Sequence, residues 1–429
     1  MKTSNTRRRF LQRTGIACAA AFTAPNILPH RVFGANERIS VGCIGVRNQG
    51  LGNLERFIKA GADIVAVCDV DAEVAAAAVT RASQSGPAPK QFSDYRRLLE
   101  QPGIDAVVIT TPDHWHALMT IDACQAGKDV YCEKPLSLTI AEGRRMSNAA
   151  RHHQRIVQTG SQQRSSGEFW TACMLVRNGF IGSVTEILVG IPDPNHPGPL
   201  GPDEPIPANL DYEMWLGPAP HRPYNSRRVH YNFRFWWDYS GGQITNFGAH
   251  HLDIVQWALG MDESGPISAE GSAFFNLQKI HEVTEKCRIT YQYKSGTRVI
   301  LGQGQADIPE GLTFIGSKGR IEVGRGKITT TPTELERQPL DAASLTQLYR
   351  STDHVKDFLE CMSSRQRPIC DVETGHRSAT VCHLGNIVAR LGRGVQWDPV
   401  SEKVIGDEQA QGMVDRTYRE PWKHEETVS

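Results

Sequence analysis

Two side chains have the chemistry to move a proton. Lys134 stands between Glu133 and a proline at the end of an apolar run, and His250 follows Gly248 in a helical stretch. Burial lowers the pKa of a lysine toward neutrality, so Lys134 could hydrogen-bond a substrate oxygen and relay its proton. A histidine titrates near neutral pH unaided, which makes His250 a candidate general acid–base. Taken without context, Lys134 could equally be a surface lysine. His250 could be a histidine that caps a helix or lies in the core.

A glycine-rich turn near the N-terminus has the pattern of a phosphate-binding turn. The dinucleotide fingerprint G-x-G-x-x-G is matched at its first and third glycines, Gly45 and Gly50, with Arg47, Asn48 and Gln49 between them. Gly45 would form the tight turn, and Gly50 would let the helix pack close to the strand. Arg47 replaces the middle glycine, and its guanidinium could reach the phosphate charge. A plain strand–helix turn is the alternative.

Asp69 follows the next apolar strand and is a candidate ribose ligand. A carboxylate at this place can accept hydrogen bonds from both adenosine ribose hydroxyls, and it would repel a 2′-phosphate. The predicted cofactor is therefore NAD, with NADP less favoured. Asp69 could instead cap the next helix, but Asp71 directly precedes the helix-forming residues and is the better cap.

The elements that position these residues alternate between strands and helices. This alternation, with nearly continuous apolar strands, predicts a parallel sheet covered on both faces. The predicted strands are Ile39–Val46, Ile64–Cys68, Ala106–Thr110, Val130–Cys132 and Ile156–Thr159. The predicted helices are at about Gly50–Ala60, Ala72–Ser83, Tyr95–Glu100, Trp115–Ala126, Ile140–His152 and Glu168–Arg177.

Two motifs in this half resemble the glucose–fructose oxidoreductase / inositol dehydrogenase (Gfo/Idh/MocA) family. One is Thr111-Pro112 with His116 after it, and the other is Ala126-Gly127-Lys128 leading to Glu133-Lys134-Pro135. The resemblance implies that Glu133 and Lys134 lie against the nicotinamide of the cofactor. It also implies that the loop of Thr111, Pro112 and His116 crosses the cofactor.

A second match lies in the later half. The family pattern of an acidic residue, a glycine and a histidine falls on Asn246, Gly248 and His250. Asn246 departs from the aspartate of inositol dehydrogenase-like members, so we expect a smaller rise in the pKa of His250 than an aspartate would cause. Asp253 could brace His250 or be a solvated helix carboxylate. His251 is expected to face away, because adjacent helical residues diverge.

The later half also carries candidate substrate contacts. Tyr239, beside a Gly-Gly turn, is a candidate hydroxyl donor, and Arg164 could reach the nicotinamide or the substrate. Ten of the 24 prolines lie between Pro192 and Pro223, in a segment typical of a lid or a surface excursion. It leads to an aromatic run, His230–Tyr239, which could stack on a sugar or belong to the core. No spacing supports a metal site, so none is predicted.

The fold class predicted overall is α/β. Consecutive strands at Ser183–Gly190, Ile267–Phe275, Val283–Tyr293, Thr297–Gly302, Leu312–Ile315 and Arg320–Val323 predict an antiparallel sheet. The family resemblance implies that this sheet is large, open and mostly antiparallel. The predicted domain plan is a leader at 1–35, a doubly wound Rossmann domain at 36–160, an α+β substrate and oligomerisation domain at 161–400 with bracing helices at 353–391, and an arm at 401–429.

Composition excludes several classes of protein. The 429 residues carry 47 basic and 47 acidic side chains, and a nucleic-acid binder would show a basic excess. With 39% hydrophobic and 22% charged residues, the composition is typical of a globular protein. No apolar run is long enough for a permanent membrane span. The ten cysteines show no pairing pattern, which argues against a disulfide scaffold.

The N-terminus resembles a twin-arginine export signal. Arg7, Arg8 and Arg9 precede Phe10-Leu11 and a weakly apolar stretch, and no acidic residue occurs before Glu37. We therefore expect export by the translocase of that route to the periplasm or cell envelope. A frayed basic arm is the alternative. Because the leader is basic and holds no acid, the chain beyond it is mildly acidic.

Three functions fit these features. The leading hypothesis is an NAD-dependent oxidoreductase that transfers hydride between a tightly bound cofactor and a hydroxyl of a sugar, polyol or glycoside, in a homo-oligomer. The second is a redox-neutral enzyme that cleaves glycosides by transient oxidation and elimination. The third is a non-catalytic protein that binds sugar or cofactor, for which Arg47 and Asn246 leave room.

Overall fold

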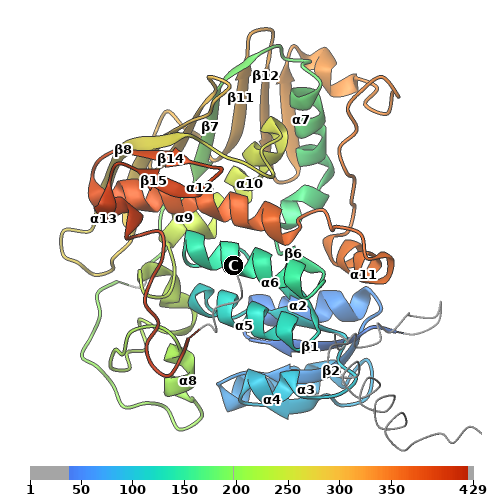
Figure 1. Cartoon of the computed structure of the whole chain (residues 1–429), viewed down its shortest axis with the longest axis vertical. Helices are drawn as coiled ribbons and strands as arrows, with labels where there is room; N and C mark the ends of the chain where they lie inside the picture. The colour runs from blue at the N-terminus through green and yellow to red at the C-terminus, as the bar shows by residue number, and fades with distance from the viewer. Residues whose placement is uncertain (1–37, 197, 424–429) are drawn as a thin grey trace, which may run out of the picture. The chain divides into compact units, whose positions relative to one another are not determined.

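Two β-sheets organise the protein (Figure 1). The computed structural model describes residues 38–196 and 198–423. The predicted leader, 1–35, and the last six residues of the predicted arm lie outside the described residues.

The first sheet has six parallel strands in the order β3-β2-β1-β4-β5-β6. They are β1 (Ser40–Ile44), β2 (Asp63–Cys68), β3 (Lys90–Phe92), β4 (Ala106–Ile109), β5 (Asp129–Cys132) and β6 (Val157–Thr159). The strand order reverses between β1 and β4, which is where α/β sheets bind ligands at their carboxyl edge. The predicted parallel Rossmann sheet is confirmed. The edge strand β3 is an addition, because its Lys-Gln-Phe sequence has no apolar run to mark it.

Helices cover both faces of this sheet. They are α2 (Gln49–Lys59), α3 (Ala72–Ala82), α4 (Tyr95–Leu99), α5 (Asp113–Gln125) and α6 (Ile140–His152). The side chain of Asp71 accepts hydrogen bonds from the first-turn amides of α3, so the predicted cap is confirmed. Helix α5 begins two residues before the predicted start, since Pro112 already occupies its N-cap position.

The second sheet has nine strands in the order β13-β12-β11-β7-β10-β9-β8-β14-β15. They are β7 (Val184–Ile191), β8 (Ser268–Phe275), β9 (Thr284–Gln292), β10 (Arg298–Gln303), β11 (Gly311–Gly316), β12 (Arg320–Gly324), β13 (Lys327–Thr331), β14 (Val395–Asp398) and β15 (Lys403–Ile405). The sheet is mostly antiparallel, as predicted, but β7 and β10 pair in parallel. The last three strands were not predicted, because they are short and only β14 carries a large apolar anchor, Trp397.

The remaining helices belong to the later half, and α12 contacts strands of both sheets. They are η1 (Gln162–Ser165), α7 (Gly167–Arg177), α8 (Tyr212–Leu216), η2 (His230–Phe235), α9 (Gly242–Asn246), α10 (Gly248–Leu259), η3 (Thr333–Arg337), α11 (His354–Ser364), α12 (Val372–Leu391) and α13 (Glu408–Gln411). The long helix α12 packs against α6 on one side and against β8 and β9 on the other (Figure 1). Arg144 of α6 holds Glu373 of α12 through two hydrogen bonds of 2.7 and 2.8 Å.

Two further predictions can be checked against the described residues. Among residues 38–196 and 198–423, no helix combines the length and the apolar character that crossing a bilayer requires. All nine cysteines in this part of the chain are buried thiols outside any disulfide.

Candidate active site

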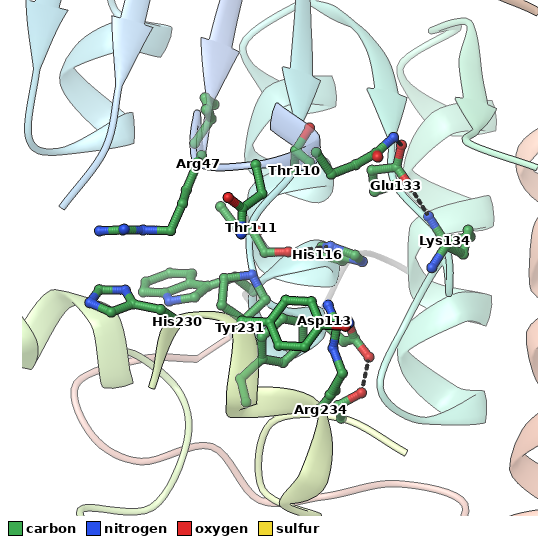
Figure 2. A pocket seen from close by; sticks show the side chains of 18 of the residues that line it. Arg47, Thr110, Thr111, Asp113, His116, Glu133, Lys134, His230, Tyr231 and Arg234 are labelled. Atoms are coloured by element: carbon green, nitrogen blue, oxygen red, sulfur yellow. Dashed lines mark hydrogen bonds between the residues drawn. The ribbon is translucent and has the colours of Figure 1, made fainter. Parts of the chain in front are cut away.

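A cavity of about 440 Å³ lies at the carboxyl ends of β1, β2, β4 and β5. Figure 2 shows two sides of it: Arg47, Thr111 and Lys134 come from the Rossmann sheet, and His230, Tyr231 and Arg234 come from η2. The cavity therefore runs between the glycine-rich turn and the Glu133-Lys134-Pro135 segment. It is lined by every residue predicted to bind the cofactor except Gly50 and Arg164.

The glycine-rich turn has the close packing expected of a dinucleotide fold. Gly45 adopts a φ of 77°, and its amide donates to the Cys68 carbonyl at 2.8 Å. A Cβ on Gly50 would lie 2.0 Å from the Gly45 carbonyl oxygen, so only glycine fits there. Asn48, at the N-cap of α2, has a φ of 41°. Arg47 lines the cavity and forms an ion pair with Asp71.

Asp69 lies at the end of the cavity beside this turn. Its carboxylate accepts hydrogen bonds from the amides of Val46 at 2.9 Å and Asp71 at 3.0 Å. Burial raises its pKa, and these two amides and Arg47 oppose the rise. A carboxylate has about four acceptor sites, so two remain for a ligand hydroxyl.

Lys134 lies at the opposite end, next to a cis peptide bond with Pro135. Its Nζ donates to the backbone oxygen and to the Oδ1 of Asn246, each at 3.1 Å. Burial lowers the pKa of Lys134, while Glu133 and Asp113 act in the opposite direction. The side chain is thus a hydrogen-bond donor whose proton is more easily lost than that of a surface lysine.

His250 lies in the first turn of α10 and also lines the cavity. Its pKa is well below the ordinary value because the ring is buried and because Lys134 and Arg325 add positive charge nearby. Its Nδ1 has no hydrogen-bond partner among the residues that the structure describes. The expected small rise in its pKa is therefore wrong. Asn246 does not support His250 but holds Lys134, and its Nδ2 donates to Gln243 at 2.9 Å.

Glu133 and His116 hold the backbone around Lys134. Glu133 Oε1 accepts from Asn53 at 2.9 Å and from Gln49 at 3.2 Å, which ties β5 to the first turn of α2. The two ring nitrogens of His116 face the carbonyl oxygens of Pro135 and Thr111 at 2.8 and 2.9 Å. His116 lines the cavity, but its polar atoms are committed to these two loops. Thr111 Oγ1 and Pro112 complete that wall.

Three predicted residues lie elsewhere. Arg164 is not at the cofactor: its buried guanidinium pairs with Asp253 at 2.8 Å and with Asp262 at 2.7 Å. Asp253 therefore neutralises Arg164, and its carboxylate does not accept from His250 Nδ1. Tyr239 is fully buried behind the cavity, where its ring packs on His114 and Trp215. His251 faces away as predicted, with Nδ1 at 3.1 Å from the Gly190 carbonyl.

Other cavity residues carried no assigned role. Asp113 was seen only as part of a motif, but its buried carboxylate lines the cavity and accepts from Ser240 Oγ at 2.5 Å. Burial raises the pKa of Asp113. Arg325 follows β12, lines the cavity, and donates to Gln163 at 3.1 Å. No spacing signal marked Arg325, because only the sheet topology brings it to His250.

The predicted aromatic run divides between the cavity and the core. His230, Tyr231, Phe233 and Arg234 line the cavity, whereas Phe235 and Trp236 belong to a buried cluster beneath them. The guanidinium of Arg234 stacks 3.7 Å from the centre of the Tyr231 ring. The residues that line the cavity are therefore placed where they could stack on a sugar, whereas Phe235 and Trp236 belong to the core.

The residues present fit a bound NAD. The turn has the close strand–helix packing of a dinucleotide fold at Gly45 and Gly50, and Asp69 keeps free acceptor capacity beside it. Among the described residues, Thr111 Oγ1, Arg234 Nε and His250 Nδ1 are buried polar atoms without a partner, and all three residues line the cavity. Buried polar groups are normally satisfied, so these atoms indicate a polar ligand.

Comparison with known proteins agrees with this geometry. Residues 39–161 match the oxidoreductase family's NAD-binding Rossmann fold, and residues 200–424 match its C-terminal alpha/beta domain. The chain belongs to the Gfo/Idh/MocA oxidoreductase family. Its N-terminal half is therefore an NAD-binding Rossmann domain.

Individual relatives in this family differ in what their names say they do. Myo-inositol 2-dehydrogenase of Thermotoga maritima is 25% identical over 296 residues, which cover 67% of this chain and 78% of the relative. An alpha-N-acetylgalactosaminidase of Shewanella oneidensis is 30% identical over 201 residues. That match covers 42% of this chain and spans only 44% of the length of that relative.

Solved structures support the fold. The WlbA dehydrogenase from Bordetella pertussis, solved with NADH and UDP-GlcNAcA, has a TM-score of 0.64 at 17% identity. The similarity covers 84% of this chain and 99% of that one. At this level of identity, the similarity concerns the fold alone.

Proposed function

We propose that this protein oxidises a hydroxyl group of a sugar, polyol or glycoside, using an NAD that stays bound and returns its hydride to the carbonyl group of a second substrate. The observation that carries the proposal is the meeting of Lys134 and His250 at one end of the NAD-binding cavity, with the pKa of each lowered. When bound, NAD accepts hydride from the carbon that carries the hydroxyl.

The protein's own residues then have separate tasks. Lys134 donates a hydrogen bond to the substrate oxygen, and Asn246 keeps its ammonium directed there. His250 is neutral at physiological pH, because its pKa is lowered, so it can take up the hydroxyl proton. Tyr231 and Phe233 offer aromatic faces to the substrate, and the carboxylate of Asp113 can accept from a second hydroxyl.

A second candidate is glycoside cleavage by transient oxidation and elimination, with no net redox change. The similarity to an alpha-N-acetylgalactosaminidase favours it. The same cavity residues serve this route, because it also begins with loss of a hydroxyl proton and a hydride. The two candidates differ in the product and not in the first step.

We further propose that the protein is exported through the twin-arginine route and works as a homo-oligomer in the periplasm or cell envelope. The support is the Arg7-Arg8-Arg9-Phe10-Leu11 sequence. Export favours a cofactor that is loaded before translocation and regenerated on the enzyme.

One experiment tests the two candidate activities and the bound cofactor together. The purified protein is denatured to release nucleotide, and the folded protein is given chromogenic glycosides and free sugars without added NAD. We expect released NAD and turnover; aglycone release identifies cleavage, whereas oxidation of one sugar with reduction of another identifies hydride transfer. Lys134→Met should lose at least about 100-fold in kcat, and Lys59→Met, an exposed lysine on α2, is the matched control. Full activity of Lys134→Met would overturn the assignment.

A further inference from the structure

Two histidines and a glutamate meet away from the lining of the NAD cavity. His196 lies in the proline-rich segment after β7, His281 lies in the turn before β9, and Glu285 lies on β9. One ligand atom from each residue lies within 4.8 Å of the other two. Two neutral imidazoles and a carboxylate are a donor set that divalent transition metals prefer.

His281 is the independent sign that something binds there. Its side chain is 1% exposed, and neither ring nitrogen has a hydrogen-bond partner among the described residues. Nε2 faces Glu285 Oε1 at 3.5 Å without completing a hydrogen bond. Leaving a buried polar group unsatisfied costs about 1–3 kcal/mol, so folded proteins rarely do so without a ligand or water.

The spacing of the donor atoms suits a tetrahedral ion. His196 Nε2 lies 3.8 Å from Glu285 Oε1, and His281 Nε2 lies 3.5 Å from the same oxygen. Ligands held about 2.0–2.1 Å from a tetrahedral zinc ion are roughly 3.4 Å apart. These two distances therefore need to shorten by only a few tenths of an ångström, and the ligand atoms of the two histidines lie within 4.8 Å of each other.

The surroundings orient the carboxylate ligand, whereas the contact that His196 makes must change. Asn276 Nδ2 donates to Glu285 Oε1 at 2.6 Å, which fixes the carboxylate as outer partners of metal ligands do. His196 Nδ1 accepts a long hydrogen bond, 3.3 Å, from the amide of Gly198. Metal binding at Nε2 leaves the proton on Nδ1, so this weak bond is given up.

We propose that His196, His281 and Glu285 bind one divalent transition metal ion of the Zn²⁺ class, with water completing the tetrahedron. The ion would fasten the proline-rich segment to β9. That segment reaches the active site, because the Asp193 carbonyl accepts from Gln243, which in turn holds Asn246. The two histidine rings also pack on Phe235, the residue after the cavity residue Arg234.

This proposal departs from the sequence prediction of no metal site. The sequence showed His281 beside Glu282, but Glu282 is committed to Arg222 and to the amide of Trp237. The third ligand, His196, comes from a distant segment. Only the pairing of β9 in the sheet and the path of the loop bring it near.

The test uses the full chain after treatment with a chelator. Titration with Co²⁺ should give the visible spectrum of a tetrahedral site at one equivalent, and Zn²⁺ should displace it. His281→Ala and Glu285→Gln should weaken Co²⁺ binding at least about 100-fold. The matched control is His152→Ala, because exposed His152 stacks against His153 and is a candidate for adventitious binding.

Two readouts make the outcome decisive. Circular dichroism and NAD binding show whether each variant folds, and His196→Ala, in a loop, serves if His281→Ala does not. Equal Co²⁺ affinity in the wild type and in folded His196→Ala or Glu285→Gln would overturn the proposal. So would loss of the tetrahedral spectrum in His152→Ala alone.

Discussion

Asn246→Asp is the most informative change in the active site. Asn246 accepts from Lys134 Nζ through its Oδ1 at 3.1 Å, so the substitution replaces a neutral acceptor by a charged one of the same size. It also puts back the residue that the family resemblance leads one to expect. We expect the pKa of Lys134 to rise, because a negative charge favours the ammonium form.

The magnitude follows from the distance. A unit charge 3.1 Å from Nζ attracts the ammonium by about 5 kcal/mol at an effective dielectric constant of about 20. The new carboxylate loses hydration, and one of its oxygens would face Gln243 Oε1, where Asn246 now donates at 2.9 Å. These costs leave a rise of about 1–3 units in the pKa of Lys134.

The assay needs no substrate. The protein is labelled with acetic anhydride over a series of pH values, and peptide mass spectrometry follows acetylation of Lys134 against that of exposed lysines. The midpoint for Lys134 reports its pKa in the folded protein. In the wild type it should lie below the usual range for a lysine.

Asn246→Ala is the control, because it removes Oδ1 without adding a charge. Lys134 keeps its bond to the backbone oxygen of residue 246, so its pKa should not rise. If Asn246→Asp leaves the midpoint of Lys134 unchanged or lowers it, the argument that Asn246 governs the charge of Lys134 is refuted.

Three further predictions test the binding half and the contact between helices. Asp69→Asn should weaken NAD binding about 10- to 100-fold and reduce the preference for NAD over NADP, measured by calorimetry with both nucleotides. Gly50→Ala should lower the Tm and abolish NAD binding, because its Cβ would meet the Gly45 carbonyl at 2.0 Å; Gly52→Ala, whose nearest neighbour is 3.7 Å away, should do neither. Glu373 has its pKa lowered to about 2 despite burial, through hydrogen bonds from its arginine partners, so its stabilisation exists above about pH 4.5 and is lost as pH falls toward 2. The wild type should therefore lose free energy of unfolding between neutral pH and about pH 3, and Glu373→Gln should lose about 2 kcal/mol less over the same range. Urea denaturation at both pH values measures this difference. An equal loss in the two proteins would contradict the assignment.

Local patterns predicted much of the Rossmann half. Its apolar runs have the length of buried parallel strands, and Asp71 precedes a helix-forming stretch, so the strands and the cap follow from adjacent residues. The turn from Gly45 to Gly50 could be read for the same reason. The turn needs glycines where the backbone packs closely, and these two glycines are only five positions apart in the sequence.

The errors at Arg164 and Asp253 have a common physical origin, which is long-range charge pairing. Arg164 begins the crossover into the second half, where an arginine could equally face a ligand or a buried acid. Asp253 and Asp262 neutralise it there, and no local pattern announces that pairing. Because Asp253 pairs with Arg164, it does not brace His250. Tyr239 was misplaced because aromatic residues in a run can face the core or a cavity, and only packing decides.

The charge arrangement at the end of the cavity near Lys134 explains how the site works with an amide at position 246. Lys134, Arg234, Arg325 and His116, whose ring nitrogens both face carbonyl oxygens, bring four cationic groups to this end of the cavity, while Asp113 and Glu133 bring two carboxylates. An aspartate at 246 would reduce this positive excess; with asparagine, the larger excess remains. That excess lowers the proton affinity of His250 and adds to the effect of burial on Lys134. Asparagine in place of aspartate at position 246 therefore does not remove a base from the site. It keeps His250 neutral down to lower pH, and it leaves Lys134 closer to releasing its proton.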